Sequence, residues 1–499
     1  MTFSHSCHTL AAACPGVSWH GAERIINGLS ADSRQVQPGY LFAALSGSST
    51  SGAHFVEQAL AAGALAILHD GSLQLPEQVS QLIHPQPRVA LALLASAFYG
   101  HPSRNMTMVA ITGTNGKTST AAMLEAILQE QESYRGKVGV IGTTGIRGPG
   151  INLPNPLTTP DPIALQATLQ RLAAAQCRVV VMEVSSHALE QRRTAGIHWQ
   201  VAIFTHLTRD HLDYHQTEQA YFASKAALFE RDQPAHAVIG IEDHWGVTLA
   251  ERCQEQMPLA TFQLECPGEP AAPFPKSAHF CASDIQLSWQ ESRFCLHSPA
   301  GQTAIFLPSP GRFNVANAIA AAAASWHLGI SLPDIAQGLA HFRPAPGRMQ
   351  TIQAGQPFAV LVDYAHTPDA LERLLHSTRS LTSGRIILLF GCGGNRDRGK
   401  RPMMGEIAAR LADIVLITDD NPRSEDPTTI RQEVRSGCLG SAAQIIDIAD
   451  RQQAIHTALA MASPGDALLL VGKGHETVQI TAEGNHPFDD GAIARHHLA

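Results

Sequence analysis

The chain has 499 residues, of which 44% are hydrophobic and 16% charged, and 35 Lys and Arg against 43 Asp and Glu give a formal net charge of −8. This length suffices for about three domains, and the apolar content excludes disorder driven by charge. The mild acidity argues against a general nucleic-acid-binding protein, which usually carries a basic face. No apolar run approaches the roughly 18 residues of a membrane helix, and no signal peptide is visible. We therefore expect a cytoplasmic multidomain protein with no nucleic-acid partner and no membrane span.

The cysteines indicate the same compartment. Nine of them are spread from Cys7 to Cys438 without a Cys-x-x-Cys pair. This scatter predicts free, buried thiols in a reducing environment.

Apolar runs divide the first half of the chain. Short runs at 40–45 and 64–68 predict a small α/β domain, and the polar, turn-rich segment 99–104 predicts a linker. Beyond it, apolar runs alternate with helical segments, which predicts a mostly parallel sheet with helices on both faces. The expected strands are 108–112, 138–141, 179–182, 201–204 and 238–241.

The second half begins with a proline-containing segment, 256–302, in which we expect irregular structure. A helix is expected at 317–326, which is dominated by alanine, and the proline-rich segment 341–347 predicts a second linker. Strands are then expected at 358–362, 385–390, 413–418 and 466–471. The fold class is therefore α/β, in three domains at 1–103, 104–343 and 344–499.

A glycine-rich loop stands between an expected strand and an expected helix. Its residues are Gly113, Thr114, Asn115, Gly116, Lys117, Thr118 and Ser119. Glycines let backbone N–H groups turn toward phosphates, the helix N-terminus favours anions, and Lys117 supplies a cation. Thr118 would offer its hydroxyl to Mg²⁺. Although Ile111 stands where the general pattern has its first glycine, the context predicts ATP binding.

Nine further strings follow in a fixed order, and together with the loop they resemble the Mur ligases, in particular the UDP-N-acetylmuramoyl-tripeptide synthetases. The strings are TTPD at 158–161, MEVSSHAL at 182–189, LTRDHLDYH at 207–215, YFASKAALF at 221–229, PGRM at 346–349, DYAHTPDAL at 363–371, GCGGNRD at 391–397, DNPR at 420–423 and GKGHE at 472–476. The resemblance covers essentially the whole chain. It implies a domain for the UDP-sugar, a central ATPase and a Rossmann-like third domain for an amino acid.

The resemblance implies amide formation through an acyl phosphate, with Lys117, Glu183, His211 and Lys225 as catalytic residues. Thr118, Glu183, His211 and Lys225 would hold Mg²⁺, the last as a carbamate formed with CO₂ (N6-carboxylysine). From the residues alone, Glu183 could equally form a strand-end ion pair, His211 could be structural, and Lys225 could be an exposed helix lysine. The implied nucleotide contacts outside the loop are Asn317, Arg348 and Asp363.

The remaining implied residues bind the other two substrates. For the UDP-muramoyl-dipeptide they are Ser33, Ser48, Ser49, Thr50, Thr158, Thr159, Ser185, Gln191 and Arg193, although the serines of the first domain could equally be turn caps. For meso-diaminopimelate they are Arg396, Asp420, Asn421, Pro422, Arg423, Gly472 and Glu476. Arg423 is implied to bind the carboxylate that lysine lacks, since guanidinium groups bind carboxylates in a bidentate manner. A monomer is expected.

Two positions depart from the family pattern. Asn395 stands where an Asp is usual, and His206 stands where an Asn is usual. Three alternatives compete with this interpretation: another Mur ligase or a folylpolyglutamate synthetase, a P-loop switch or motor ATPase, and an inactive binding protein on the same scaffold. The D-N-P-R loop argues against the folate enzymes, and the two additional domains argue against a switch or motor ATPase. The presence of Lys117, Glu183 and Lys225 argues against an inactive protein.

Overall fold

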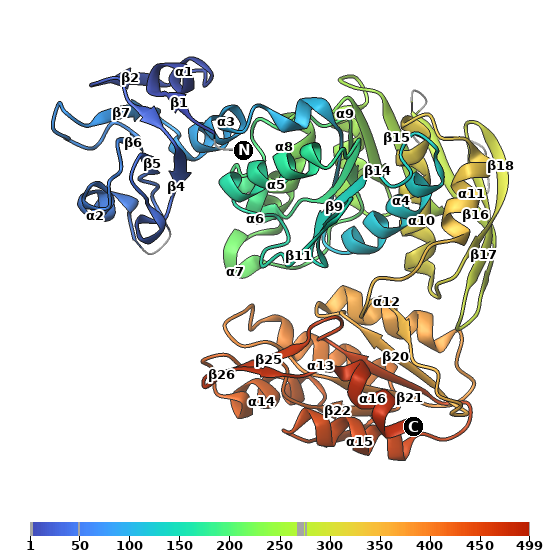
Figure 1. Ribbon diagram of the computed structural model, residues 1–499. Coiled ribbons are helices and arrows are strands. Elements are labelled where there is room, and N and C mark those ends of the chain that lie inside the picture. The colour runs from blue at the N-terminus through green and yellow to red at the C-terminus, as the bar shows by residue number, and fades with distance from the viewer. Residues whose placement is uncertain (1–2, 48–49, 267–273, 275–276, 499) are drawn as a thin grey trace. The chain divides into compact units, whose positions relative to one another are not determined.

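The computed structural model describes residues 3–47, 50–266, 274 and 277–498, and its elements are shown in Figure 1. The chain forms two compact units, which we describe separately. Unit 1 comprises 1–110, 134–202 and 224–235, and unit 2 comprises 111–133, 203–223 and 236–499. Within the described ranges, no helix is both long and apolar enough to cross a membrane.

Unit 1 begins with a five-stranded sheet in the order β2-β7-β6-β5-β4, in which only β2 is antiparallel to its neighbour. Leu41 and Leu68 pack on one face with helices α1 and α3, and Phe42 and Ile67 pack on the other with α2. The bounds are α1 Cys7–Ala12, β2 Ser18–His20, β4 Gly28–Ser30, β5 Tyr40–Ala43, α2 Val56–Ala61, β6 Ala66–His69, β7 Ser80–Ile83 and α3 Pro87–Phe98.

A larger sheet has strands in both units. In unit 1 its order is β11-β10-β9-β12-β8, and in unit 2 it continues from β8 through β13, β14, β15, β16 and β17 to β18, because β8 and β13 each have residues in both units. The bounds are β8 Thr107–Thr112, β9 Val138–Gly142, β10 Gly145–Gly148, β11 Ile151–Leu153, β12 Val179–Glu183, β13 Val201–Phe204, β14 His236–Gly240, β15 Leu259–Glu265, β16 Ala278–Leu287, β17 Ser292–Ser298 and β18 Gly301–Leu307. All five strands expected from the apolar runs are present, displaced by at most two residues.

The expectation of irregular structure at 256–302 is wrong. The segment forms β15, β16, β17 and the start of β18. β16 is parallel to β15, whereas β17 is antiparallel to both of its neighbours, β16 and β18. Their side chains alternate between buried and exposed, as in Phe294 and Leu296 of β17, with Arg293 exposed between Ser292 and Phe294. A strand with one solvent-exposed face carries only about half the apolar residues of a buried parallel strand, so the apolar pattern that predicts a strand is weaker.

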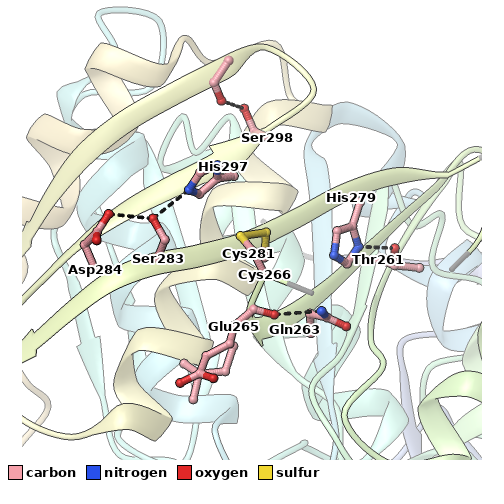
Figure 2. Close-up of a disulfide and its surroundings, with 12 residues drawn as sticks. Thr261, Gln263, Glu265, Cys266, His279, Cys281, Ser283, Asp284, His297 and Ser298 are labelled. Atoms are coloured by element: carbon pink, nitrogen blue, oxygen red, sulfur yellow. Dashed lines mark hydrogen bonds between the residues drawn. A yellow bond between two sulfur atoms is a disulfide. The ribbon is translucent and has the colours of Figure 1, made fainter. Parts of the chain in front are cut away.

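The expectation that every cysteine is a free thiol is wrong for two of the nine. Cys266, which directly follows β15, forms a disulfide with Cys281 of β16 (Figure 2). The two cysteines are 15 residues apart in sequence, but their Cα atoms lie 5.0 Å apart because β15 and β16 are paired strands. Strand register, which the sequence did not reveal, therefore brings the sulfurs together. The free cysteines among the described residues are Cys7, Cys14, Cys177, Cys253, Cys295, Cys392 and Cys438.

The alanine-rich segment forms α10 (Arg312–His327), as expected, with longer bounds. Residues 318–324 are fully buried, and α10 packs against α4 (Lys117–Glu130) and β15. Small side chains allow this close packing on both sides. A further helix, α11 (Leu332–Ala340), contacts α4 and β18 and precedes the expected second linker.

The end of α10 predicts a pH dependence of stability. The ring centroids of His327 and His236 lie 4.5 Å apart, and burial together with His236 lowers the pKa of His327 to about 4. Since its unfolded pKa is about 6.5, its contribution to stability is present above about pH 6.5 and is lost as the pH falls toward about 4. Between about pH 7.5 and about pH 5, this residue should lower the free energy of unfolding, measured in urea, by about 2 kcal/mol. In the variant His327→Gln, the free energy of unfolding should fall less between these two pH values than in the wild-type protein, by that amount. An equal fall in both proteins would contradict the prediction.

The last part of unit 2 is a six-stranded sheet in the order β19-β20-β24-β21-β22-β23, parallel except for β19. Helices α12, α13 and α14 cover one face, and α15 and α16 cover the other (Figure 1). The bounds are β19 Gln350–Thr351, β20 Ala359–Asp363, α12 Pro368–Arg379, β21 Ile386–Phe390, α13 Lys400–Leu411, β22 Ile414–Ile417, α14 Pro427–Gly437, β23 Gln444–Asp447, α15 Arg451–Met461, β24 Ala467–Val471 and α16 Asp490–Leu498. In such doubly wound sheets, ligands bind at the carboxyl ends of the strands.

Candidate active site

The glycine-rich loop lies between β8 and α4, as expected. Gly113 and Gly116 have φ angles of 142° and 87°, which L side chains rarely adopt. A Cβ atom at Gly113 would overlap Thr205 Oγ1, and one at Gly116 would overlap Asn317 Oδ1. Both glycines are therefore required by space as well as by backbone conformation.

Lys117 is the first residue of α4, and its Nζ donates to the carbonyl oxygens of Gly113 (2.9 Å) and Thr114 (3.0 Å). The Thr114 hydroxyl lies 3.1 Å from the Thr208 carbonyl oxygen and 3.2 Å from Tyr221 Oη. The loop thus holds the ammonium group above its own backbone at the positive end of a helix, where a phosphate would be stabilised.

A cavity in unit 2 adjoins this loop. Arg348 donates from Nη2 to Thr118 Oγ1 (3.4 Å), and its guanidinium lies 4.6 Å from the Tyr364 ring centre. Asp363 is buried, which raises its pKa, and it accepts from the backbone N–H groups of Met349 and Ala365. The cavity is lined by six of the expected nucleotide contacts, namely Asn115, Gly116, Ser119, Asn317, Arg348 and Asp363, and by Phe262 and Phe313 among others.

His206, one of the two departures, also lines the cavity. Its Nε2 lies 3.8 Å from Asp369 Oδ2, and its carbonyl oxygen accepts from the Thr114 N–H at 2.9 Å. The backbone contribution does not depend on the side chain, so replacing the usual Asn leaves the loop contact intact.

Glu183 is the last residue of β12 and is 1% exposed. Its two carboxylate oxygens accept from the Thr143 N–H (2.9 Å) and the Thr143 hydroxyl (3.1 Å). A Cβ at Gly142 would overlap Glu183 Oε1, which explains that glycine. Thr143 was missed by the sequence analysis, although its place directly after β9 is the signal that could have identified it.

Four of the residues expected to bind the muramoyl-dipeptide are connected to Glu183 within unit 1. Thr159 Oγ1 donates to the Glu183 carbonyl oxygen (2.9 Å) and accepts from the Ser185 N–H (3.0 Å). Arg193 donates to the Thr159 carbonyl oxygen (2.8 Å) and to Gln191 Oε1 (2.7 Å). The network joins a hydroxyl, an amide and a guanidinium to the strand end that carries the carboxylate. Thr158 lies beside it, 3.4 Å from Thr143 Oγ1.

A second cavity, in unit 1, is lined by Gln191 and Arg193 together with Ser30, Ala31, Asp32 and Arg88. Ser33 does not line it, and its hydroxyl donates to Gln58 Oε1 at 2.9 Å. Thr50 does not line it either, and Ser48 and Ser49 lie outside the described residues. The cavity therefore reaches the expected Asp-Ser-Arg segment through the neighbours of Ser33.

Lys225 and His211 occupy different environments. Lys225 lies on α8 (Glu218–Glu230) and is 1% exposed, so it is no exposed helix lysine. His211 has a φ of 55°, and its Nε2 lies 3.4 Å from Asp210 Oδ2. Burial raises the pKa of Asp210, but His211, His366 and Lys400 together lower it to about 2.

The residues expected to act in catalysis or to hold Mg²⁺ are divided between the two units. Glu183 and Lys225 belong to unit 1, whereas Lys117, Thr118 and His211 belong to unit 2.

The residues expected to bind the amino acid follow the carboxyl ends of β21, β22 and β24. Arg423 donates to the Gly394 carbonyl oxygen (2.8 Å), and burial together with the nearby Arg396 lowers its pKa. Two guanidinium groups thus share one edge of the sheet. Asn395, the other departure, accepts from the Ser424 N–H and hydroxyl through Oδ1, contacts that a carboxylate could also make.

The remaining members of this set are also close together. Asn421 Nδ2 donates to Glu476 Oε2 at 2.7 Å, and the Gln479 side chain donates to the Asp420 carbonyl oxygen at 2.9 Å. Gly472, with a φ of 110°, would place a Cβ 2.9 Å from Asp420 Oδ2. The structure therefore brings cationic and anionic groups together at the edge where a zwitterionic ligand could bind.

A strand–glycine loop–helix unit with a lysine at the start of the helix, together with a second doubly wound sheet, is typical of a nucleotide-dependent enzyme of the α/β class. Three family models match the chain: the Mur ligase middle domain at residues 111–325, the Mur ligase glutamate ligase domain at 347–474, and the Mur ligase family catalytic domain at 25–109. The chain belongs to the Mur ligase family.

Several relatives carry one name, UDP-N-acetylmuramoyl-L-alanyl-D-glutamate–2,6-diaminopimelate ligase. The proteins from Gloeobacter violaceus and Geobacillus thermodenitrificans are 42% and 39% identical, over 95% and 98% of this chain and 94% and 98% of their own. A solved structure of the same name is 34% identical, with a TM-score of 0.66 over 95% of this chain and 94% of its own. An ADP-bound MurF from Thermotoga maritima, 15% identical with a TM-score of 0.58 over 94% of this chain and 95% of its own, shares the fold.

Proposed function

We propose that the protein joins meso-diaminopimelate to UDP-N-acetylmuramoyl-L-alanyl-D-glutamate with hydrolysis of ATP to ADP and phosphate, in the cytoplasm. The observation that carries the proposal is identity of about 40% to ligases of that name over nearly their full length. The three predicted domains, 1–103, 104–343 and 344–499, would bind the UDP-sugar, ATP and the amino acid respectively. The linker at 343–347 would allow the third domain to close on the others.

The chemistry requires activation of the D-glutamyl γ-carboxylate, because an oxide is a very poor leaving group. Attack of this carboxylate on the γ-phosphate gives an acyl phosphate and ADP, and the amino group then displaces phosphate. Negative charge accumulates in both steps, and Lys117 at the helix N-terminus is placed to stabilise it. The nucleotide would occupy the unit 2 cavity, beside Arg348 and Asn317.

The residues present fit Mg²⁺ in their donor chemistry. Magnesium prefers hard oxygen ligands, and the Thr118 hydroxyl and the buried Glu183 carboxylate supply them. His211, which offers a nitrogen, is the less usual ligand. In the described part of the chain, no group of three or more His, Cys, Asp or Glu side chains lies together as a metal site. The proposed set therefore depends also on the Thr118 hydroxyl and on Lys225 as a carbamate. The bound ion would neutralise phosphate charge.

Lys225 would contribute as a carbamate. Reaction of its neutral amine with CO₂ forms an N–C bond and releases one proton, which converts a cation into an anionic oxygen ligand. Burial at 1% exposure supports this proposal, because an unmodified ammonium is costly to desolvate.

Arg423 and Arg396 would select the amino acid. Meso-diaminopimelate carries a distal carboxylate that lysine lacks, and the two guanidinium groups at the sheet edge favour a ligand with that charge. Glu476 would receive the distal ammonium group.

The test is phosphate release with ATP, Mg²⁺ and the UDP-dipeptide, comparing meso-diaminopimelate with L-lysine as acceptor. We expect release that requires diaminopimelate, with a UDP-tripeptide identified by mass. Turnover with lysine alone would retain the ligase and refute the role of Arg423. No release with either would refute the proposed reaction, and a folate substrate would be tried next.

A further inference from the structure

Lys473 is a buried lysine to which neither the family resemblance nor the mechanism above assigns a role. It lies two residues beyond β24, at the edge that carries the amino-acid site, and its side chain is 0% exposed. Its Nζ donates to three oxygens: the Val478 carbonyl (2.7 Å), Asn421 Oδ1 (3.0 Å) and Glu476 Oε2 (3.3 Å). All three donor positions of the ammonium group are therefore used, and two of them point to residues of the amino-acid site.

These contacts fix the orientation of the Asn421 amide. Its Oδ1 accepts from Lys473 and from the Ile480 N–H (2.9 Å), so its Nδ2 must face the Glu476 carboxylate, 2.7 Å away. Rotating the amide by half a turn would set its NH₂ group against two donors. Lys473 thus determines which group Asn421 presents to Glu476, and it binds the same carboxylate oxygen itself.

Lys473 also ties a β-hairpin to this edge. The hairpin consists of β25 (Val478–Thr481) and β26 (Gly484–Pro487). Val478 is bound by Lys473, Ile480 N–H donates to Asn421, and the Ile480 carbonyl oxygen accepts from the Arg423 N–H at 3.0 Å. The backbone of the D-N-P-R loop is therefore held by a hairpin whose first residue is anchored on Lys473.

The charge of Lys473 suits its place among acidic groups. Asp420 is buried, which raises its pKa; Arg451 and Lys473 oppose this rise, and Glu476 and Asp490 add to it. Arg451 is committed to Asp490 through a buried bidentate ion pair. Lys473 is thus the cation directly bound to Glu476 in this cluster.

We propose that Lys473 is a positioning residue for the amino-acid substrate, holding Asn421 and Glu476 in the arrangement that receives the distal zwitterionic end of a diamino dicarboxylic acid. The inference rests on the proposed function, whose amino-acid site it deepens. It predicts that loss of Lys473 weakens binding of the amino acid but not of the other substrates. The reason is that Lys473 belongs neither to the phosphate loop nor to the lining of the unit 2 cavity.

The variant Lys473→Met keeps the length of the side chain and removes the charge and the donors. We expect KM for meso-diaminopimelate to rise about tenfold or more, as for loss of a hydrogen bond to a charged group, while KM for ATP and for the UDP-dipeptide changes by less than about twofold. The matched control is Arg385→Met, which removes a cation bound to the buried Asp466 at the opposite end of β24. It should lower Tm without changing any KM.

A double-mutant cycle with Glu476→Gln separates positioning from general destabilisation. If Lys473 acts through Glu476, the two effects on KM for diaminopimelate should be strongly non-additive. Additive effects, or an equal rise of all three KM values, would overturn the inference. Should Lys473→Met not fold, Lys473→Gln retains a donor for Asn421 but no charge beside Glu476, and the same selective rise is expected. An inactive wild-type enzyme would instead refute the proposed reaction, and the inference with it.

Discussion

Replacing Lys117 with alanine is expected to lower kcat about a thousandfold, with KM for the UDP-dipeptide nearly unchanged. The Lys117 ammonium group lies over the Gly113 and Thr114 carbonyl oxygens at the start of α4, where transferred phosphate charge would be stabilised. Removing one preorganised charge-stabilising group typically lowers a rate by about two to three orders of magnitude, and a full positive charge should lie at the upper end. The measurement is phosphate release at saturating substrates.

The matched control for this variant is Lys137→Ala. Lys137 directly precedes β9, in unit 1, and its substitution makes the same change of net charge. The control should keep near wild-type turnover. If Lys117→Ala also turned over near the wild-type rate, the assignment of the glycine-rich loop to ATP would be wrong.

The second large effect concerns Lys225. Both Lys225→Ala and Lys225→Arg should lower kcat about a hundredfold or more, because arginine keeps the positive charge but cannot form the carbamate. Turnover of the wild-type enzyme should also fall in CO₂-depleted buffer and return when bicarbonate is added. The two substitutions together distinguish a carbamate from a cationic role for this buried lysine of α8.

An active Lys225→Arg enzyme would contradict the carbamate and assign Lys225 a cationic role instead. Native mass spectrometry of the wild-type protein provides an independent measurement, since conversion of lysine to the neutral N6-carboxylysine adds the mass of one CO₂. Circular dichroism of each variant would establish that it is folded.

The parallel strands could be predicted from the sequence because both of their faces are buried. The run 201–204 is apolar at every position and forms β13 with those bounds. The four expected strands of the C-terminal sheet are present within a residue or two, whereas the strands at its two edges, β19 and β23, were not predicted. The antiparallel extension β16-β17-β18 was not predicted, because its alternating pattern is interrupted by polar residues on the exposed face. The disulfide was missed for the related reason that it depends on pairing between strands.

The candidate site was predictable where a local motif carries it and not where tertiary contacts do. The glycine-rich loop and the D-N-P-R segment are continuous in sequence, and each follows the expected strand. Thr143 and Lys473 act on residues 40 and 52 positions away, Glu183 and Asn421, so no local pattern indicates them. Ser33 shows the converse, since a serine in a suggestive motif directs its hydroxyl to Gln58.

The alanines of α10 have a consequence for the unit 2 cavity, in which we propose that the nucleotide binds. Residues 320–324 are buried alanines, which have no side-chain rotamers, so their packing cannot adjust by rotamer changes. A larger residue at any of these positions would shift the whole helix. Asn314 and Asn317, on the same helix, line the cavity, and the Asn317 amide lies against Gly116. We therefore expect this wall to keep one shape whether or not a nucleotide is bound. Little ordering entropy should be lost there on binding, and adaptation of the cavity to other nucleotides would have to come from residues outside α10.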